Sequence, residues 1–324
     1  MLYDKRAVFI VVKIRKCGII GLGFVGSSIA FSLMQAGLFS EMVLIDANGQ
    51  KAIGEAMDLS HGLSYAKPAK IYAGTYADLT DCSLIIITAG ANQAPGETRL
   101  DLVAKNAKIL KSIIPQITEY NRECILLIVS NPVDILTYVA LKLSGFPANR
   151  VIGSGTVLDT GRLKYLIGDH LQVDSRNVHS FVIGEHGDSE LPVWSSANVS
   201  GIDLVDFCKD CGKCENMSTM NALFEDVRSS AYKIIEYKKA TYYGIAMATL
   251  KIAECIMRDE KSVLPVSALA EGHYGLHDIC LSLPAVIGIN GIERVLDIPL
   301  DEKESANLNK SAETLRNILS QIEL

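Results

Sequence analysis

The chain has 324 residues and a mass of 35.1 kDa, which suits two domains better than one because single hydrophobic cores stop growing at roughly 250–300 residues. Hydrophobic residues make up 49% and charged residues 21%, a balance that excludes a disordered or fibrous chain. The 31 Lys and Arg against 37 Asp and Glu leave a formal net charge of −6, which argues against nucleic acid or an anionic membrane as a partner.

Residues 1–13 are predicted to be an extra N-terminal segment. Its short apolar stretch, Ala7–Val12, is flanked by basic residues and lacks the small-residue cleavage site of a secretory signal. No apolar run approaches the ~20 residues that a membrane helix needs. The eight cysteines are scattered rather than spaced as a disulfide framework. With no export signal, we expect a protein of the reducing cytoplasm.

Short apolar runs alternate with longer helical patterns through the first half of the chain. The predicted strands are Cys17–Ile20, Met42–Ile45, Lys70–Ala73, Leu84–Thr88 and Ile125–Val129. The predicted helices are Val25–Gln35, Gln50–Ser60 and Ala104–Tyr120, the last with a kink or break at Pro115. Near-continuous apolar strands fit a parallel sheet buried on both faces. The alternation predicts a doubly wound α/β sheet of the Rossmann type over residues 1–150.

The pattern changes after about residue 150, where we place a domain boundary. Predicted helices follow at Leu158–Leu171, Asn221–Lys239, Ala246–Arg258 and Ala306–Glu323. Predicted strands follow at Val178–Ile183, Ser262–Leu269 and Ile279–Ile287. We therefore expect residues 151–324 to form an α+β substrate and catalytic domain with antiparallel strands.

A glycine fingerprint directly follows the first predicted strand and opens the first predicted helix. Gly21 allows a tight turn, Gly23 lets the backbone approach a pyrophosphate, and Gly26 permits close packing of helix and strand. Asp46 ends the second strand, at the spacing of the acid that binds the adenosine ribose hydroxyls. Because this carboxylate would repel a 2′-phosphate, NAD is favoured over NADP.

Five further segments carry a resemblance that covers roughly residues 14–320. They are GANQAPGETRL at 90–100, SNPVD at 130–134, LDTGR at 158–162, GEHGD at 184–188 and ATYYG at 240–244. Together with the fingerprint they resemble the lactate/malate dehydrogenase family. The resemblance implies NAD-dependent hydride transfer between a 2-hydroxy acid and its keto acid.

The resemblance also implies a role for four catalytic positions. His186 is the proton acceptor and donor, because imidazole exchanges a proton near neutral pH. Asp159 orients this histidine and stabilises its charged form. Arg162 binds the substrate carboxylate with its guanidinium fork. Arg99 lies in a lid segment and polarises the carbonyl group as the lid excludes water.

The cofactor contacts implied by the resemblance extend beyond the fingerprint. They include Phe24, Val25, Gly90, Ala91 and Ile245. Asn131 contacts either the nicotinamide ribose or the substrate, or simply belongs to a turn that ends its strand.

Gln93 bears on the substrate, because it occupies the lid position where malate dehydrogenases carry Arg. A neutral side chain there leaves the second carboxylate of oxaloacetate unpaired, which favours pyruvate and lactate. Thr241 resembles the small residue beneath the pyruvate methyl group. Malate and larger 2-hydroxy acids remain alternatives on the same scaffold. Two departures lie nearby: Lys239 replaces a common Gly, and Val157 a common Asn.

Bacterial relatives are often activated by fructose 1,6-bisphosphate bound between subunits. The matching basic positions here are Lys164, where Arg is usual, and His179. The alternative is a solvated lysine and an interface histidine. The resemblance further suggests a homotetramer. A non-enzymatic dinucleotide-binding protein on this scaffold is the competing class.

Cys208, Cys211 and Cys214 form two metal-ligand spacings in tandem within a polar segment that we expect to be a loop. Three thiolates at this spacing are able to bind zinc or to contribute to an iron–sulfur cluster. No fourth ligand is evident in the sequence. The alternative, and our prediction, is a surface loop with free or oxidisable thiols and no bound metal.

Overall fold

The computed structural model describes residues 15–91, 96, 98–214 and 217–322. The predicted N-terminal extra segment, residues 1–13, lies outside this description. Among the described helices, none combines the length and the apolar character required to cross a membrane.

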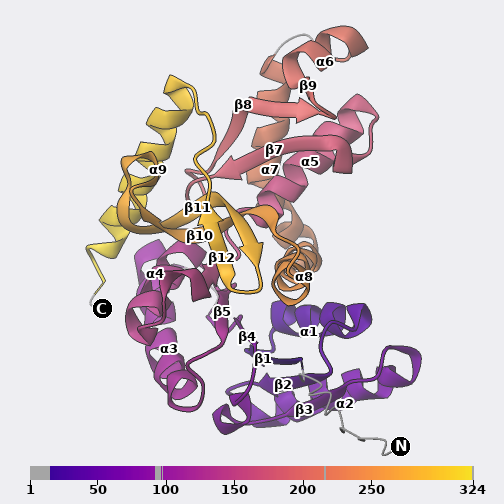
Figure 1. The fold of residues 1–324 in the computed structure, drawn as a ribbon, viewed down its shortest axis with the longest axis vertical. Helices are drawn as coiled ribbons and strands as arrows, with labels where there is room; N and C mark the ends of the chain where they lie inside the picture. Colours follow the sequence, from indigo (N-terminus) through magenta and orange to yellow (C-terminus); the bar gives the residue numbers. More distant parts are fainter. Residues whose placement is uncertain (1–14, 92–95, 97, 215–216, 323–324) are drawn as a thin grey trace, which may run out of the picture.

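A nine-stranded sheet runs through the molecule in the order β12-β11-β10-β6-β5-β4-β1-β2-β3 (Figure 1). Its strands are β1 (Lys16–Ile20), β2 (Glu41–Ile45), β3 (Lys70–Ala73), β4 (Leu84–Ile87), β5 (Ile125–Ile128), β6 (Val151–Gly153), β10 (Ser262–Glu271), β11 (His277–Gly288) and β12 (Gly291–Val295). The first six strands are parallel in the doubly wound order 3-2-1-4-5-6. The predicted fold class is therefore confirmed.

The antiparallel strands extend this same sheet rather than starting a separate one. Strand β10 joins β6 through the antiparallel pair Ser267 and Gly153, and β11 and β12 follow in sequence. Gly153 permits this junction because a Cβ there would lie 2.7 Å from the Ser267 side chain and 2.3 Å from that of Thr137. Residues on both sides of the predicted boundary thus share one layer.

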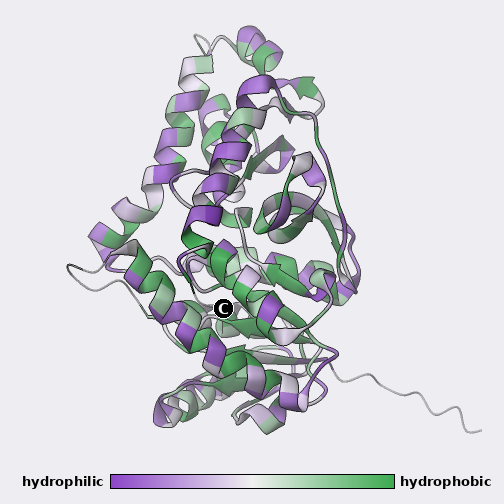
Figure 2. Cartoon of the chain, turned by 90° about the vertical axis from the view of Figure 1, so that its left-hand side faces the viewer, coloured by the Kyte–Doolittle hydropathy of each residue, from purple (hydrophilic) through white to green (hydrophobic). Residues whose placement is uncertain are grey.

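Helices cover both faces of the sheet, because its central strands are apolar on both sides. Strands β4 and β5 are buried at every position. One face packs on α3 (Arg99–Tyr120), α4 (Val133–Ser144) and α9 (Glu302–Leu319), and the other on α1 (Phe24–Ala36), α2 (Gly49–Gly62) and α8 (Tyr243–Arg258). Figure 2 shows hydrophobic and hydrophilic residues side by side along these helices, as expected for amphipathic helices.

A second sheet of three antiparallel strands forms the upper lobe in Figure 1. Its strands are β7 (Val178–Ile183), β8 (Leu191–Val199) and β9 (Ile202–Asp203). A third core packs this sheet against α5 (Val157–Leu171), α6 (Leu204–Cys211) and α7 (Met217–Lys238). A bridge between Gly184 and Ser282 connects the end of β7 to the large sheet.

Two local features differ from the predictions. Of the kink or break predicted at Pro115, the break does not occur, since α3 continues through this residue with its apolar face buried against the sheet. The cysteine segment is not wholly a loop, since Cys208 and Cys211 belong to α6. Its polar composition concealed an amphipathic helix whose buried side includes Leu204 and Cys208.

Candidate active site

The glycine fingerprint forms the turn from β1 into α1. Gly21 adopts a positive φ of 95°, which L side chains rarely allow. A Cβ at Gly26 would lie 1.9 Å from the Gly21 carbonyl oxygen, so only glycine fits this approach of helix to strand. Gly23 is the N-cap residue of α1, and a Cβ there would meet nothing within 4 Å. The space beside Gly23 is therefore open at the positive end of the helix dipole.

Asp46 connects the end of β2 to this turn. Its half-buried carboxylate accepts hydrogen bonds from the backbone amides of Leu22, at 2.7 Å, and Asn48, at 2.9 Å. The Leu22 amide lies between the first two glycines, so the acid is held beside the fingerprint. The predicted ribose-binding acid and glycine turn are thus neighbours.

Asn106, which we did not predict as a site residue, hydrogen-bonds to the loops that follow β4 and β5. Asn106, on α3, is 2% exposed. Its side-chain oxygen accepts a 2.7 Å hydrogen bond from the Ala91 amide, and its nitrogen donates to the Asn131 carbonyl at 2.7 Å. A Cβ at Gly90 would lie 3.4 Å from the same side chain. Asn106 therefore positions two predicted cofactor segments relative to each other.

The start of α1 also contacts the connection between α7 and α8. Phe24 is exposed and stacks on Tyr242, with 5.4 Å between the ring centroids. The Lys238 ammonium lies 3.5 Å from the Tyr242 centroid. Val25 and Ile245 are half-buried against the core on this face of the sheet. These contacts bring the predicted cofactor positions of α1 and α8 together.

A cavity of about 280 Å³ lies between α5, α7 and the turn that follows β7. It gathers four predicted site residues, namely Asn131, Asp159, Arg162 and His186. The other lining residues are Leu102, Pro132, Gly187, Asp188, Glu190, Val227, Arg228, Ala231, Tyr232 and Ile235. This volume suits a molecule of a few non-hydrogen atoms next to charged groups.

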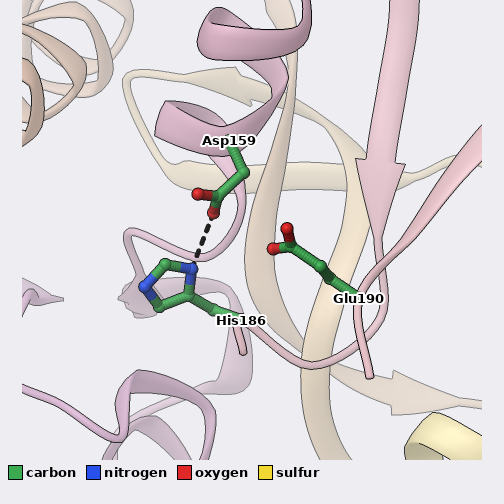
Figure 3. A group of neighbouring side chains, drawn as sticks. All are labelled: Asp159, His186 and Glu190. Atoms are coloured by element: carbon green, nitrogen blue, oxygen red, sulfur yellow. Dashed lines mark hydrogen bonds and ion pairs between the residues drawn. The ribbon is translucent and has the colours of Figure 1, made fainter. Parts of the chain in front are cut away.

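Asp159 lies at the centre of the charged groups (Figure 3). One of its oxygens is 2.6 Å from Nδ1 of His186, and the other accepts a 2.8 Å hydrogen bond from Arg162. Burial opposes ionisation of Asp159, but the charges of His186 and Arg162 hold the pKa of its carboxyl below the usual value. Burial likewise lowers the pKa of His186, but the charge and hydrogen bond of Asp159 outweigh it and raise this pKa to about 9.

Charged residues that we did not predict lie in the cavity or beside it, among them Asp134, Glu190 and Arg228. Buried Asp134 accepts a 2.7 Å hydrogen bond from the His186 amide, and it belongs to the SNPVD segment. Glu190 is 8% exposed and lies just beyond GEHGD. Arg228 donates to the Asp188 carbonyl at 2.8 Å, while its Nε is buried without a partner among the described residues. Membership of SNPVD was the available signal for Asp134 and proximity to GEHGD was the signal for Glu190, whereas none of the quoted segments lies near Arg228 in the sequence.

Glu190 extends the Asp159–His186 pair into a group of three. One ligand-type atom from each residue lies within 4.8 Å of the others, and the Glu190 carboxylate points toward the pair (Figure 3). Burial and the nearby charge of Asp159 raise the pKa of Glu190 to about 8. The group belongs to the cavity already described. The thiols of Cys208, Cys211 and Cys214 do not form such a group within the described part of the chain.

Other predicted site residues lie elsewhere or beyond the description. Gln93 lies outside the described residues, and Arg99 is the first residue of α3 but its side chain is not described. Thr241 lies in the α7–α8 connection and does not line the cavity. Lys164 is on α5, where burial lowers the pKa of its ammonium, and His179 is exposed on β7.

Comparison with known proteins places this geometry in a family. Residues 15–153 match the model of the lactate/malate dehydrogenase NAD-binding domain, and residues 156–323 match that of the α/β C-terminal domain. The chain belongs to the lactate/malate dehydrogenase family. Its first matched segment is the NAD-binding domain of that family, in agreement with the open glycine turn and Asp46.

Named relatives within the lactate/malate dehydrogenase family are similar over nearly the whole chain. The L-lactate dehydrogenase of Acetivibrio thermocellus is 52% identical over 96% of this chain and 98% of its own. L-lactate dehydrogenase 1 of Clostridium acetobutylicum is 51% identical over 95% and 98%. A crystal structure of a lactate dehydrogenase from a Medee basin deep-sea metagenome library has a TM-score of 0.93 at 44% identity, covering 95% of this chain and 98% of its own.

Proposed function

We propose that the protein is an NAD-dependent L-lactate dehydrogenase, which interconverts L-lactate and NAD⁺ with pyruvate and NADH. The observation that carries the proposal is the cavity in which Asp159 joins Arg162 to His186. A histidine and an arginine that contact the same carboxylate can transfer a proton and bind an anion in a single site. Relatives of about 50% identity carry this name.

The nucleotide fits the described residues. The open space at Gly23, the N-terminus of α1 and the carboxylate of Asp46 match a pyrophosphate and an adenosine ribose. NAD, when bound, supplies the hydride acceptor or donor. We propose that Phe24, Val25, Gly90, Ala91, Asn131 and Ile245 complete its contacts, and that residues 1–150 and 151–324 are the cofactor and substrate domains.

In the proposed mechanism the substrate carboxylate binds Arg162. One guanidinium nitrogen of Arg162 already donates to Asp159, and the planar group has five N–H donors in total. His186 uses Nδ1 for Asp159, so its Nε2 exchanges the proton with the substrate oxygen. A rise in the His186 pKa keeps this proton available for pyruvate reduction at neutral pH. Arg99 polarises the carbonyl group in this scheme.

For the substrate, we propose pyruvate and lactate over oxaloacetate and malate. The basis is the neutral Gln93 in the lid segment, together with Thr241 as the small residue near the substrate methyl group. Burying the second carboxylate of oxaloacetate against a neutral amide costs several kcal/mol. A larger 2-hydroxy acid is the second candidate, because uncharged side chains such as Leu102 and Ile235 line the cavity.

A keto-acid panel tests this function. NADH oxidation is measured with pyruvate, oxaloacetate and 2-ketoisocaproate, in the parent protein and in His186→Asn. We expect the highest kcat/KM for pyruvate and a large loss in the variant. Gln93→Arg is expected to move the kcat/KM ratio toward oxaloacetate. An unchanged ratio would contradict the specificity argument, and an undiminished rate in His186→Asn would contradict the mechanism.

Assembly, regulation and location complete the proposal. We propose a homotetramer of the cytoplasm that binds fructose 1,6-bisphosphate at Lys164 and His179. Lys164 offers a single charge where a guanidinium would bind a phosphate bidentately, so we expect weak activation. The pyruvate KM is measured with and without the bisphosphate, in the parent and in Lys164→Ala. A KM that does not change in the parent would rule the activation out.

A further inference from the structure

The turn that carries His186 is fixed through its backbone. Three consecutive amides of this turn donate hydrogen bonds to three different elements. The Gly184 amide donates to a carbonyl oxygen of β11 at 2.9 Å, and the Glu185 amide to Oγ of Ser311 on α9 at 2.7 Å. The His186 amide donates to a carboxylate oxygen of Asp134 on α4 at 2.7 Å. Of these three acceptors, the carboxylate alone is able to carry a charge.

Asp134 is a costly acceptor for a backbone amide. It is 2% exposed, and its second oxygen, Oδ1, is buried without a partner among the described residues. Holding one amide in place requires only a neutral oxygen, such as the hydroxyl that Ser311 supplies to the preceding amide, whereas a buried carboxylate loses its hydration. A carboxylate at this position therefore indicates a use for its charge as well as for its hydrogen bond.

The ionised form of Asp134 has support from its own helix. Asp134 lies in the first turn of α4, where the helix dipole favours a negative charge. Burial raises the pKa of this carboxyl, against the opposing effect of the His186 amide and the His186 charge. A proton on Oδ1 would have no acceptor within the described part of the chain. We therefore expect Asp134 to be ionised at neutral pH.

Asp134 lies behind the cavity wall rather than in it. Asn131 and Pro132, which directly precede α4, line the cavity, whereas Asp134 is not among the described lining residues. The hydrogen bond from the His186 amide thus fixes the proposed proton carrier relative to the wall that carries Asn131. A residue in this place acts on the reaction through His186.

Charged groups on other elements also act on the His186 imidazole. Asp159 on α5 contacts it directly, and a Glu190 oxygen lies within 4.8 Å of ligand-type atoms of both residues. Burial lowers the pKa of His186, while the charges of Asp159, Glu190 and Asp134 raise it. Strand β11 packs on α4, and burial raises the pKa of its Cys280 well above the usual value, so this thiol stays uncharged. The further ionisable residues that line the cavity are Arg162, Asp188, Arg228 and Tyr232.

We propose that Asp134 is a positioning residue for the proton transfer, which holds the His186 backbone against the start of α4 and stabilises the protonated imidazole with its charge. This inference rests on the proposed function, in which His186 exchanges the proton. Asp159 acts on two groups, because its second oxygen holds Arg162. Asp134 contacts the histidine amide instead. Loss of its charge should therefore lower the proton affinity of His186 and leave the binding of the substrate anion unchanged.

Asp134→Asn separates the two roles, because the amide oxygen still accepts the hydrogen bond while the charge is lost. Deuterium exchange at the imidazole Cε1, whose rate follows the ionisation of the ring, is measured across pH on the full-length protein by mass spectrometry. Trypsin places His186 on peptide 177–209 together with His179, an internal reference that fragment ions distinguish. We expect the ionisation midpoint of His186 to fall by roughly 0.5–1.5 pH units in the variant, and that of His179 to stay the same.

The reaction provides a second readout. In Asp134→Asn, the alkaline limit of kcat/KM for the best keto acid should move down by the same amount. The KM for that acid, measured well below the limit, should change less than about twofold. If neither protein reduces any keto acid, the proposed function is wrong, and the deuterium exchange alone decides whether Asp134 stabilises protonated His186.

Ser311→Ala is the matched control, because it removes the neutral acceptor of the neighbouring Glu185 amide. It should lower the melting temperature by a few degrees and leave the His186 midpoint unchanged. Asp134→Ser is measured where Asp134→Asn does not fold. An unshifted His186 midpoint in the Asp134 variant, or an equal shift in Ser311→Ala, would overturn the proposal.

Discussion

Asp159 shares its two oxygens between the proposed proton carrier, His186, and the proposed anion binder, Arg162. Because one oxygen contacts His186 and the other Arg162, the carboxylate holds both groups in fixed geometry inside a buried site. A charged imidazole is thereby stabilised where burial alone would make it neutral. At the scale of residues, the pH dependence of the reaction should therefore depend on this carboxylate.

Replacing Asp159 with Asn should move the alkaline limit of pyruvate reduction. Reduction requires the protonated imidazole, so kcat/KM in the parent should fall as pH rises through about 9, the pKa of His186. Without the Asp159 charge that pKa drops toward the ordinary ~6.5, and the fall should occur at lower pH, with a loss of about 10²–10⁴-fold at neutral pH. The measurement is a pH profile of kcat/KM for both proteins. An unshifted limit would refute the role of Asp159.

Glu190 should add a second ionisation above neutral pH. Its carboxyl has a pKa of about 8, mainly because of burial and then Asp159. As it ionises, a negative charge appears beside the anion-binding cavity, so the pyruvate KM should rise. We expect two ionisations, near pH 8 and 9, in the KM profile of the parent and one in Glu190→Gln. Asp226→Asn is the control, because it removes the charge of an exposed carboxylate on α7 that does not line the cavity. Two ionisations in the KM profile of Glu190→Gln would contradict the assignment.

At the scale of elements, two glycines of the turn between β1 and α1 should have different roles, Gly26 in packing and Gly23 in cofactor binding. Gly26→Ala places a Cβ 1.9 Å from the Gly21 oxygen, so we expect a loss of about 1–3 kcal/mol in the free energy of unfolding. Gly23→Ala meets nothing within 4 Å, so it should fold normally but bind NADH at least about tenfold more weakly. Thermal unfolding and NADH fluorescence titration measure the two effects. Equal NADH affinity in Gly23→Ala and the parent would show that the cofactor does not approach this backbone.

The residue that follows α7, Lys239, adopts a left-handed backbone conformation that is typical of glycine. Lys239 has φ 73°, and its amide closes the helix on the Ile235 carbonyl at 2.8 Å. The departure from the family pattern at this residue therefore leaves the left-handed turn unchanged and adds strain instead. Lys239→Gly should raise the unfolding free energy by about 0.5–1 kcal/mol.

Lys238→Gly is the matched control for this prediction. It changes the last helical residue and removes the ammonium above Tyr242, so it should destabilise by about 1 kcal/mol. Thermal unfolding compares both variants with the parent. A lower melting temperature in Lys239→Gly would mean that the left-handed conformation carries no strain.

At the scale of the whole molecule, the surface keeps apolar side chains that the single chain does not cover. Ile53 and Met57, four residues apart on one face of α2, are 45% and 55% exposed, and Met247 on α8 is 60% exposed. Exposed apolar side chains that neighbour each other, as Ile53 and Met57 do on α2, favour subunit contacts. In the proposed tetramer, Met57→Lys should weaken assembly, with Lys51→Ala on the same helix as the control. Light scattering after size-exclusion chromatography gives the mass; an unchanged tetramer in Met57→Lys would exclude this face.

The doubly wound sheet was predictable because its signals are local. Buried strands such as Leu84–Ile87 are continuous apolar runs, and the glycine spacing marks the turn from β1 into α1. Helix α4 was missed because it is buried on nearly all sides, so its apolar residues show no period. Strand β6 is three residues long and β8 begins next to Pro192, which leaves little pattern to detect.

The sequence by itself determined the residue types of the site, since a nucleotide turn, an acid, a histidine and an arginine each have a recognisable local setting. Only the tertiary structure decided which other groups join them. Asp134 and His186 are 52 residues apart, and Asn106 connects two loops that follow different strands. Such contacts depend on how helices pack across a sheet, and no spacing along the chain encodes that.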